Sequence, residues 1–459
     1  MDSREQLMLN EHPTKLMLRF SIPAIIGMLM NAIYNIVDRI FVGQGVGSQG
    51  LTAITIGFPI MLIVLAFSML IAIGACANIS IFLGEGRKDK AEVYFSASIW
   101  LILIVSVILT VVLLLTLKPL LIAFGGENVI AESLDYYNIM VGFMIFNNIG
   151  FVLNSIMRGE GSPKHAMISM IVGAVANIIL DYIFIYPLKM GIKGAAIATV
   201  ISQILSLLWC IWFFLFGKSN LKFEVHKLSW NIVISIIKIG SAAFLIQLAS
   251  SLVNLFFVTG AKKYGDLAPG ISGDIAIAGI GLVNSISQLF FMPVFGINQG
   301  LQPIIGFNYG ARQYKRVKQI FLRGVIFSTI IMTSGFLLAM RAPEVILRLF
   351  TSENDTVLLN YSIHAIRMMF FVFPFLGFQI VSANYFQSVG KPMLSSFLSL
   401  SRQVIFLIPL LIILPIYMGL DGVTTAPPIA DFMATIITLI MVIREMKNLN
   451  KKHEQEIAI

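Results

Sequence analysis

Two acidic residues, Asp38 and Asp181, lie within long stretches of apolar sequence. Asp181 interrupts VANIILDYIFIYP, residues 175–187, in which no other side chain is charged. A carboxylate inside a bilayer costs about 2.5 to 3.5 kcal/mol on insertion scales, so such residues usually face a protein interior and serve a transport pathway. Burial favours the neutral form of a carboxyl group, and two adjacent carboxylates repel each other, so one of them can take up a proton.

Other polar side chains recur with these acids at helical spacing, which places them on shared faces of helices. The groups are Tyr34, Asn35 and Asp38, then Asn177 and Asp181, then Thr199 and Gln203. Carboxylate, amide, hydroxyl and carbonyl oxygens are the ligands that hard cations bind in proteins, so Na⁺ would fit this set. The residue types therefore suit H⁺ or Na⁺ and leave the choice open. No other metal site and no organic cofactor is expected.

The composition identifies a membrane protein. Of 459 residues, 58% are hydrophobic and 12% are charged, and the mean hydropathy is +0.89. About 20 apolar residues cross a bilayer as a helix. Twelve such runs predict an all-α polytopic protein with spans at 17–41, 51–83, 93–117, 134–157, 165–187, 194–216, 231–258, 275–306, 319–340, 357–386, 394–417 and 423–443. Charge-free residues 275–311 exceed one straight span, and Pro293 and Pro303 within them predict a kinked helix and a long tail.

The distribution of Lys and Arg sets the orientation. With the N-terminus inside, the inner loops and both termini carry 19 of these residues, whereas the outer loops carry 7. The positive-inside rule then places both termini in the cytoplasm. Because the net charge of +9 is explained by this asymmetry, no nucleic-acid partner is expected.

This orientation brings the acids to one depth. Asp38 and Asp181 precede the outer ends of spans one and five by roughly 5 to 9 Å, and Thr199 follows the outer start of span six. We therefore expect all three in the outer half of one helical bundle. The alternative for Asp38 is a pair with the adjacent Arg39 that reaches water at the membrane interface. Asp181 has no basic residue within seven positions, so this alternative is weaker there.

Further polar residues are candidates for a substrate cavity or for support of ion coupling, although they could merely bond helices together. They are Tyr34, Asn35, Asn154, Gln203, Asn284 and Gln288. The histidines have no metal-ligand spacing, and the sequence has no phosphate-binding loop and no nucleophile motif. The chain is therefore not expected to be an enzyme, and transport would draw on an ion gradient.

The chain repeats itself weakly. Its loops match at a constant offset of 228 residues, which pairs Pro187, Gly191, Gly194 and Gln203 with Pro415, Gly419, Gly422 and Asp431. A duplicated six-span unit predicts two pseudo-symmetric bundles that face each other across a cleft. We assign residues 1–216 to an N-lobe with spans one to six, 217–230 to a cytoplasmic linker, and 231–459 to a C-lobe with spans seven to twelve and a short cytoplasmic tail.

The sequence resembles the multidrug and toxic compound extrusion (MATE) transporters, of the prokaryotic multidrug-efflux type. VDRIFVGQGVGSQGLTAI, residues 37–54, is similar to the family's span-one exit, and MRGEGSPK, residues 157–164, to its span-four exit. NIILD, GIKGAAIAT and QPIIGFNYGA follow in the family's order. The resemblance covers nearly the whole chain.

The resemblance implies two six-helix lobes in a V, and an antiporter that exports bulky, hydrophobic, often cationic drugs in exchange for H⁺ or Na⁺ by alternating access. Such export confers antibiotic resistance. Prokaryotic members form a cation site in the N-lobe from an Asp on span one, an Asn and an Asp on span five, and a Thr on span six. Asp38, Asn177, Asp181 and Thr199 match these positions in order.

One departure and one alternative remain. Some branches carry acids on spans seven, eight or ten, whereas span ten here offers Arg367, so Asp431 on span twelve is the C-lobe candidate left. The alternative function is a flippase for lipid-linked saccharides from a related superfamily, although a pyrophosphate cavity needs several basic residues and the spans hold six Lys or Arg. We expect a monomeric multi-pass transporter in a bacterial or archaeal cytoplasmic membrane, with the lipid bilayer and small drugs as partners.

Overall fold

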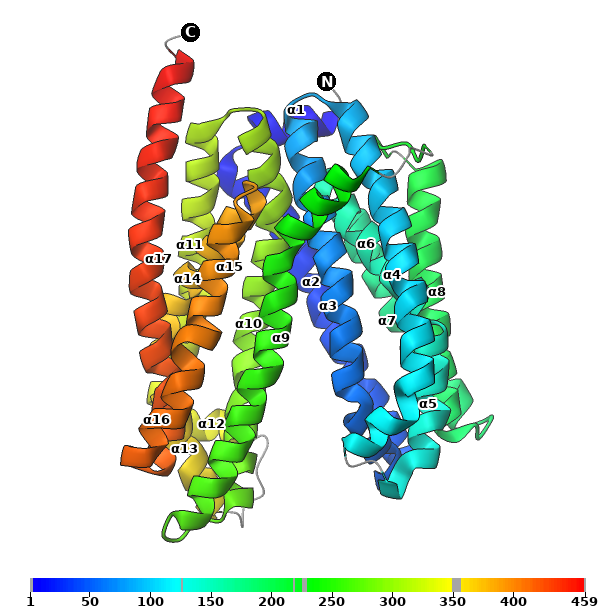
Figure 1. Ribbon diagram of the computed structural model, residues 1–459, viewed down its shortest axis with the longest axis vertical. Coiled ribbons are helices and arrows are strands. Elements are labelled where there is room, and N and C mark those ends of the chain that lie inside the picture. Colours follow the sequence, from blue (N-terminus) through cyan, green and yellow to red (C-terminus); the bar gives the residue numbers. More distant parts are fainter. Residues whose placement is uncertain (1–2, 125–126, 218, 225–228, 349–355, 458–459) are drawn as a thin grey trace.

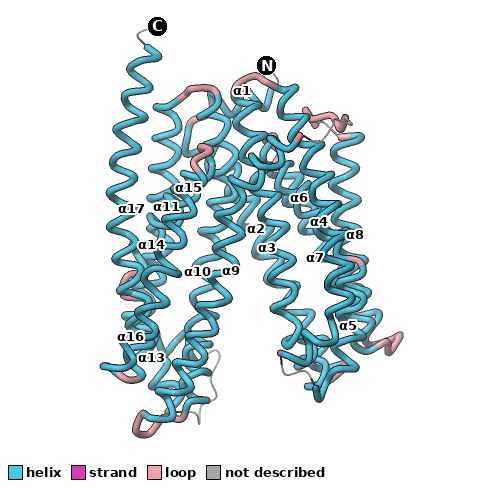
Figure 2. The backbone as a smooth tube through the Cα atoms, in the orientation of Figure 1, coloured by secondary structure: helices cyan, strands magenta, loops and turns pink. Residues whose placement is uncertain are grey.

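The computed structural model describes residues 3–124, 127–217, 219–224, 229–348 and 356–457, and every regular element in these ranges is helical (Figure 1, Figure 2). A short helix, α1 (Ser3–Asn10), precedes the first span. The long helices are α2 (Pro13–Gly45), α3 (Ser48–Gly84), α4 (Lys88–Ala123), α7 (Pro163–Ile185), α8 (Gly191–Phe216), α9 (Trp230–Leu267), α10 (Gly273–Gly310), α11 (Tyr314–Arg341) and α17 (Leu420–Ile457).

Three of the predicted spans are interrupted helices. The fourth consists of α5 (Ile130–Gly142), preceded by a single 3₁₀ turn, and α6 (Met144–Gly159), bent by 49°. The tenth consists of α13 (Thr356–Phe370) and α14 (Phe373–Ser388), bent by 50°, and the eleventh joins α15 (Pro392–Leu400) and α16 (Ile408–Met418) through a π-helix, η2 (Ser401–Leu407). The described chain thus holds ten helices of spanning length and composition, and twelve when each bent pair counts as one span. The twelve-span, all-α prediction is confirmed.

The tail predicted after span eight is a continuation of the helix. α10 continues as one helix from Gly273 to Gly310 and contains both Pro293 and Pro303. Each proline removes only one backbone donor, and the helix is held on several sides by α2, α3, α11 and α14. With 38 residues it is about 57 Å long, so it extends beyond the apolar layer.

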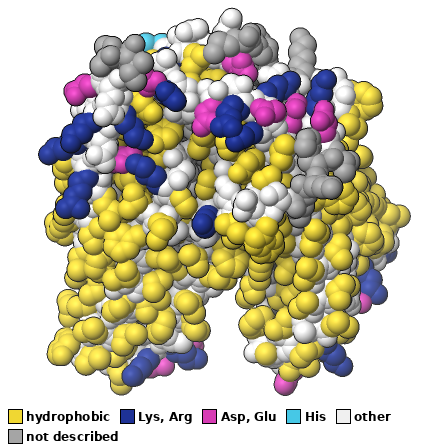
Figure 3. All heavy atoms as spheres, turned by 45° about the horizontal axis from the view of Figure 1, so that its top comes forward, with side chains coloured by type: hydrophobic (Ala, Val, Ile, Leu, Met, Phe, Trp, Pro, Cys, Tyr) yellow, Lys and Arg dark blue, Asp and Glu magenta, His cyan; other side chains and the backbone are white. Residues whose placement is uncertain are grey.

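The helices form two lobes that touch at one end and spread apart at the other. In Figure 1, α2 to α8 lie on one side and α9 to α17 on the other, with both termini at the end where the lobes meet. The space-filling view in Figure 3 shows the open cleft between the spread ends. Two glycines lie at the junction. A Cβ atom on Gly74 would lie 2.1 Å from the backbone oxygen of Ile236, and one on Gly240 would lie 1.7 Å from the backbone oxygen of Leu70. Only glycine at these positions therefore allows α3 and α9 to approach so closely.

The outer surface matches a bilayer. Large apolar side chains such as Leu115 and Leu215 point outward, at 78% and 64% exposed. Figure 3 shows Lys, Arg, Asp and Glu gathered at the end where the termini lie, above a band of hydrophobic side chains. Because lipid tails solvate apolar side chains, these surfaces are explained by the membrane and need no protein partner. Residues 218 and 225–228 of the linker lie outside the described residues, and the lobe boundaries at 216 and 231 stay predictions.

Candidate functional site

The four residues of the predicted cation site come from three neighbouring helices. Asp38 lies on α2, Asn177 and Asp181 on α7, and Thr199 on α8. α7 packs along both α2 and α8, so the side chains meet inside the first lobe. All four are buried: Asp38 is 9% exposed, Asn177 1%, Asp181 0% and Thr199 8%. This convergence is the one that spacing and depth predict from the sequence.

The hydrogen bonds of the cluster leave its acidic oxygens without donors. Asn177 Nδ2 donates to Thr199 Oγ1 at 3.3 Å, and Thr199 Oγ1 donates to the carbonyl oxygen of Ala195 at 3.0 Å. Both carboxyl oxygens of Asp181, Oδ1 of Asp38 and Oδ1 of Asn177 are buried and accept no hydrogen bond from the described protein groups. A buried polar atom left unpaired costs about 1 to 3 kcal/mol, and more when it is charged.

The two carboxyl groups face each other. Asp38 and Asp181 lie close enough to interact electrostatically through their side chains. Two ionised carboxylates at this separation repel, so the pair is stabilised by a shared proton or by a cation between them. The unpaired oxygens of Asp38, Asn177 and Asp181 are also suitable ligands for Na⁺, so the cluster fits H⁺ or Na⁺.

Two tyrosines adjoin the acidic pair. Tyr34, predicted from its place on the face of Asp38, interacts electrostatically with both acids. Tyr136 on α5 does so too and is buried, at 6% exposed. Sequence reasoning missed Tyr136, because it lies about a hundred residues from Asp38 in a different span. The only signal was the adjacent pair Tyr136 and Tyr137, whose rings lie 5.0 Å apart, in a segment that also carries Asp135 and Asn138.

Arg39 does not neutralise Asp38 through an ion pair. Within the described residues, no salt bridge joins the two, although Arg39 contributes to the electrostatic environment of Asp38. The Arg39 guanidinium is exposed and lies 6.0 Å from the centre of the Phe58 ring. Consecutive helical residues point about 100° apart, so Asp38 faces the bundle while Arg39 faces away. The alternative of a pair that reaches water together is therefore not what the structure contains.

The remaining predicted residues are separate from this cluster. Asn35 is exposed and donates to the Asn31 carbonyl at 2.7 Å, and Gln203 is half-buried on α8. Asn154 donates to the Ala166 carbonyl at 2.7 Å and accepts from Arg158, which makes it a link between α6 and α7. The other two, Asn284 and Gln288, lie on α10 in the second lobe, half-buried and exposed.

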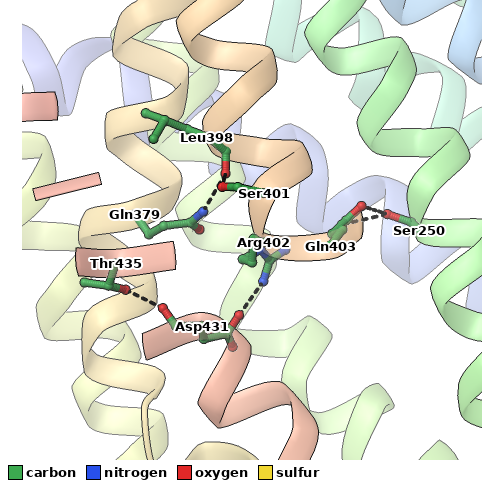
Figure 4. A network of polar contacts seen from close by, with 8 residues as sticks. All are labelled: Ser250, Gln379, Leu398, Ser401, Arg402, Gln403, Asp431 and Thr435. Carbon is green, nitrogen blue, oxygen red and sulfur yellow. Dashed lines mark hydrogen bonds and ion pairs between the residues drawn. The ribbon is translucent and has the colours of Figure 1, made fainter. Parts of the chain in front are cut away.

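A polar network in the second lobe surrounds η2, as Figure 4 shows. Asp431 on α17 is buried and pairs with Arg402, whose Nη1 lies 3.4 Å from Asp431 Oδ1. The next residue, Gln403, exchanges hydrogen bonds with Ser250 on α9 at 3.0 and 3.4 Å. Asp431 therefore already has a cationic partner, unlike Asp181. Figure 4 also shows the Thr435 hydroxyl donating to the backbone oxygen of Asp431, one turn earlier in α17.

Comparison with known proteins gives consistent results. The family model MatE matches residues 23–183 and 266–413, which is more than half of the chain. The multidrug export protein MepA of Staphylococcus haemolyticus (strain JCSC1435) is 28% identical over 436 residues, covering 93% of both chains. MepA of Staphylococcus aureus (strain MSSA476) is 25% identical over 431 residues, again covering 93% of both.

Solved structures match along nearly the full length. An outward-facing multidrug resistance MATE family transporter of the MOP superfamily superposes with a TM-score of 0.90 at 25% identity, covering 98% of this chain and 99% of the other. A MOP superfamily transporter from Pyrococcus furiosus Vc1, with a reported reverse polarity of its binding pocket, superposes equally well, with a TM-score of 0.90, 25% identity and the same coverage. The two-lobe arrangement is thus shared with these structures.

Proposed function

This chain belongs to the MATE family of membrane transporters, and from that premise we propose that it exchanges its export substrates for H⁺ or Na⁺ at the Asp38–Asp181 cluster. It is a multi-pass membrane protein and a multidrug efflux transporter, not an enzyme. The exported compounds are hydrophobic and often cationic. The protein works as a single chain in the cytoplasmic membrane of a prokaryotic cell.

One observation carries the coupling proposal. Two carboxyl groups are buried against each other, and three of their oxygens accept no hydrogen bond from the described protein groups. Such an arrangement is costly unless it binds a proton or a cation for part of the transport cycle. Asp431 in the other lobe has Arg402 as a partner, so the N-lobe pair is the better coupling site.

The orientation follows from charge. The cationic side chains gather at the end where both termini lie, and this end is cytoplasmic by the positive-inside rule (Figure 3). The cleft opens at the opposite end, so this conformation faces outward and would release drug while taking up the coupling ion (Figure 3).

Ion binding changes the packing of the first lobe. A proton or Na⁺ between Asp38 and Asp181 removes the repulsion across the contact of α2 and α7, and lets both helices pack more closely with α8. The effect on the drug site is limited by the difference in ion affinity between the two conformations, typically about 1 to 3 kcal/mol. Alternating access then follows from a shift in the equilibrium between outward- and inward-facing states.

The flippase alternative has no observation in its favour. A lipid-linked pyrophosphate needs several free basic groups in the cavity, whereas Arg402 is paired with Asp431. The relatives bear the name of a multidrug export protein.

The test is efflux of a fluorescent lipophilic cation from proteoliposomes under a pH gradient or a Na⁺ gradient, each imposed alone. We expect one of the gradients to drive efflux by the wild type and neither to drive it in Asp181→Asn. The matched control is Asp135→Asn, since Asp135 is an acid of the same lobe whose side chain is 46% exposed and pairs with Lys193 at 3.2 Å. Gradient-driven efflux by Asp181→Asn at the rate of the control, at equal protein amounts, would remove Asp181 from the mechanism.

A further inference from the structure

A groove on the flank of the second lobe has the features of a lipid site. It lies between the first turns of α9 and the segment that joins α14 to α15, and its volume is ≈ 890 Å³. Lys238, Lys391 and Ser396 supply polar groups to its lining, and Met393 and Leu394 supply apolar ones. The start of α9 and the start of α15, which line the groove, lie towards the end where the lobes touch and away from the spread ends (Figure 1).

The groove holds one positive charge without a counter-charge. Lys391 Nζ is bound by both carboxyl oxygens of Glu445, at 2.6 and 2.5 Å, so this pair is neutral. Lys238 is exposed, and no carboxylate among the described residues lies within 4.0 Å of its ammonium group. A lysine in a spanning helix normally pairs or extends to the interface, and Lys238 has no carboxylate partner among the residues that the structure describes.

The depth of Lys238 matches the boundary between lipid headgroups and acyl chains. Lys238 follows the first residue of α9, Trp230, by eight positions, or about 12 Å along the helix. Trp230 is 73% exposed, as is usual for a tryptophan at a membrane interface. The band of hydrophobic side chains begins below the charged cap at this end of the molecule (Figure 3).

The groove also offers an apolar surface beside the charge. Met393 is 86% exposed and Phe397, one turn further along α15, is 41% exposed. Both lie on the helix that packs against α9. An occupant thus meets a cation and hydroxyl groups at one end and apolar side chains next to them. A free inorganic anion would contact only the cation and the hydroxyl groups, and a cationic drug would be repelled by Lys238.

We propose that this groove binds the phosphate-bearing headgroup of an anionic phospholipid from the leaflet on the side of the termini, with Lys238 as the phosphate ligand. Basic pockets between spanning helices on the cytoplasmic side suit such headgroups. Two residues beyond Lys238, the backbone of Gly240 meets that of Leu70 in the other lobe. The lipid therefore binds beside the lobe junction and stabilises the conformation in which the lobes touch there.

The test is thermal unfolding of the detergent-purified protein, titrated with dioleoylphosphatidylglycerol, dioleoylphosphatidylcholine or glycerol 3-phosphate. We expect phosphatidylglycerol alone to raise the unfolding temperature of the wild type. In Lys238→Gln the half-saturating concentration should rise about five-fold, the factor expected for one lysine near an anionic headgroup. Lys238→Arg should keep wild-type binding. Lys164→Gln, at an exposed lysine in the first turn of α7, is the matched control and should also behave as wild type.

A second variant and a second measurement separate charge from shape. Ser396→Trp fills the groove without changing its charge and should weaken phosphatidylglycerol binding as well. Native mass spectrometry should count fewer retained phosphatidylglycerol molecules on Lys238→Gln than on Lys164→Gln. Equal binding by wild type and Lys238→Gln would overturn the proposal. An equal response to phosphatidylcholine would mean that the lysine charge plays no part, and an equal response to glycerol 3-phosphate would mean a free-anion site; either would overturn it too.

Discussion

Replacing Gly240 with alanine tests how the two lobes meet. A Cβ atom at this position would lie 1.7 Å from the backbone oxygen and 2.6 Å from the carbonyl carbon of Leu70, whereas ordinary contacts are 3.4 to 4 Å. The obstructing atoms belong to the backbone and cannot rotate away as a side chain could. α9 and α3 must therefore separate by roughly 1.5 Å or more, and the atoms around the contact lose much of their packing energy.

The expected size follows from this overlap. Overpacking a tight contact costs about 1 to 3 kcal/mol. The cost falls on the conformation in which α3 and α9 touch, which is the one with an open outer cleft. A shift of this size changes the ratio of two conformations by roughly 5- to 150-fold. We therefore expect Gly240→Ala to populate a conformation that is closed at the outer ends of the lobes.

The assay is a distance between spin labels at those outer ends. Lys118 near the end of α4 and Leu267 at the end of α9 are exposed, and each is replaced by a labelled cysteine in a background without the two native cysteines. Pulsed dipolar spectroscopy should show a larger population of short distances in Gly240→Ala. The control is Gly281→Ala, because a Cβ atom at Gly281 meets nothing within 4 Å. Unchanged distances in Gly240→Ala, or an equal shift in the control, would refute the reasoning.

Three further predictions concern other contacts and the substrates. Asp431→Asn leaves Arg402 without its carboxylate and should lower the free energy of unfolding by about 1 to 3 kcal/mol, whereas the double change of both residues to leucine should recover most of it; a stable single variant would contradict this. Arg316→Gln removes the donors to the backbone oxygens of Met8 and Glu11, so protease should cleave the N-terminal segment faster, and an unchanged rate would mean that these bonds do not hold it. Unrelated lipophilic cations should inhibit one another's efflux, because an apolar cleft discriminates weakly; strict selectivity for one compound would oppose this.

Much of the fold was predictable because lipid imposes a simple requirement. Each spanning segment must pair its backbone polar groups by hydrogen bonds within its own helix, and it needs some 20 apolar residues to cross the bilayer. Charge-free runs such as 93–117 meet the length requirement directly. The ends of helices were less predictable, since α17 continues past residue 443 to Ile457 through polar sequence outside the apolar layer. The bend after Gly142 was not predictable either, because no proline lies there and packing decides the break.

The centre of the candidate site was predictable because its residues are exceptions to the apolar pattern. An acid in a spanning helix faces the interior of the bundle and not lipid. Asp38 and Asp181 lie at the same depth, counted in residues from the ends of their spans, so their proximity could be predicted. Tyr136 was not predictable in the same way, since a tyrosine is common at interfaces and in cores alike. The Arg402–Asp431 pair was missed because it depends on how η2 turns towards α17, which no local pattern encodes.

The most direct test of ion coupling is substrate affinity measured at two pH values and two Na⁺ concentrations, in the wild type and in Asp38→Asn. Linkage requires that if an ion lowers the affinity for the drug, the drug lowers the affinity for that ion by the same factor. We predict that one of the two ions changes wild-type affinity by roughly 5- to 150-fold, and that Asp38→Asn shrinks this change while still binding drug. If wild-type affinity is the same under all four conditions, the Asp38–Asp181 cluster is structural and the coupling mechanism is wrong.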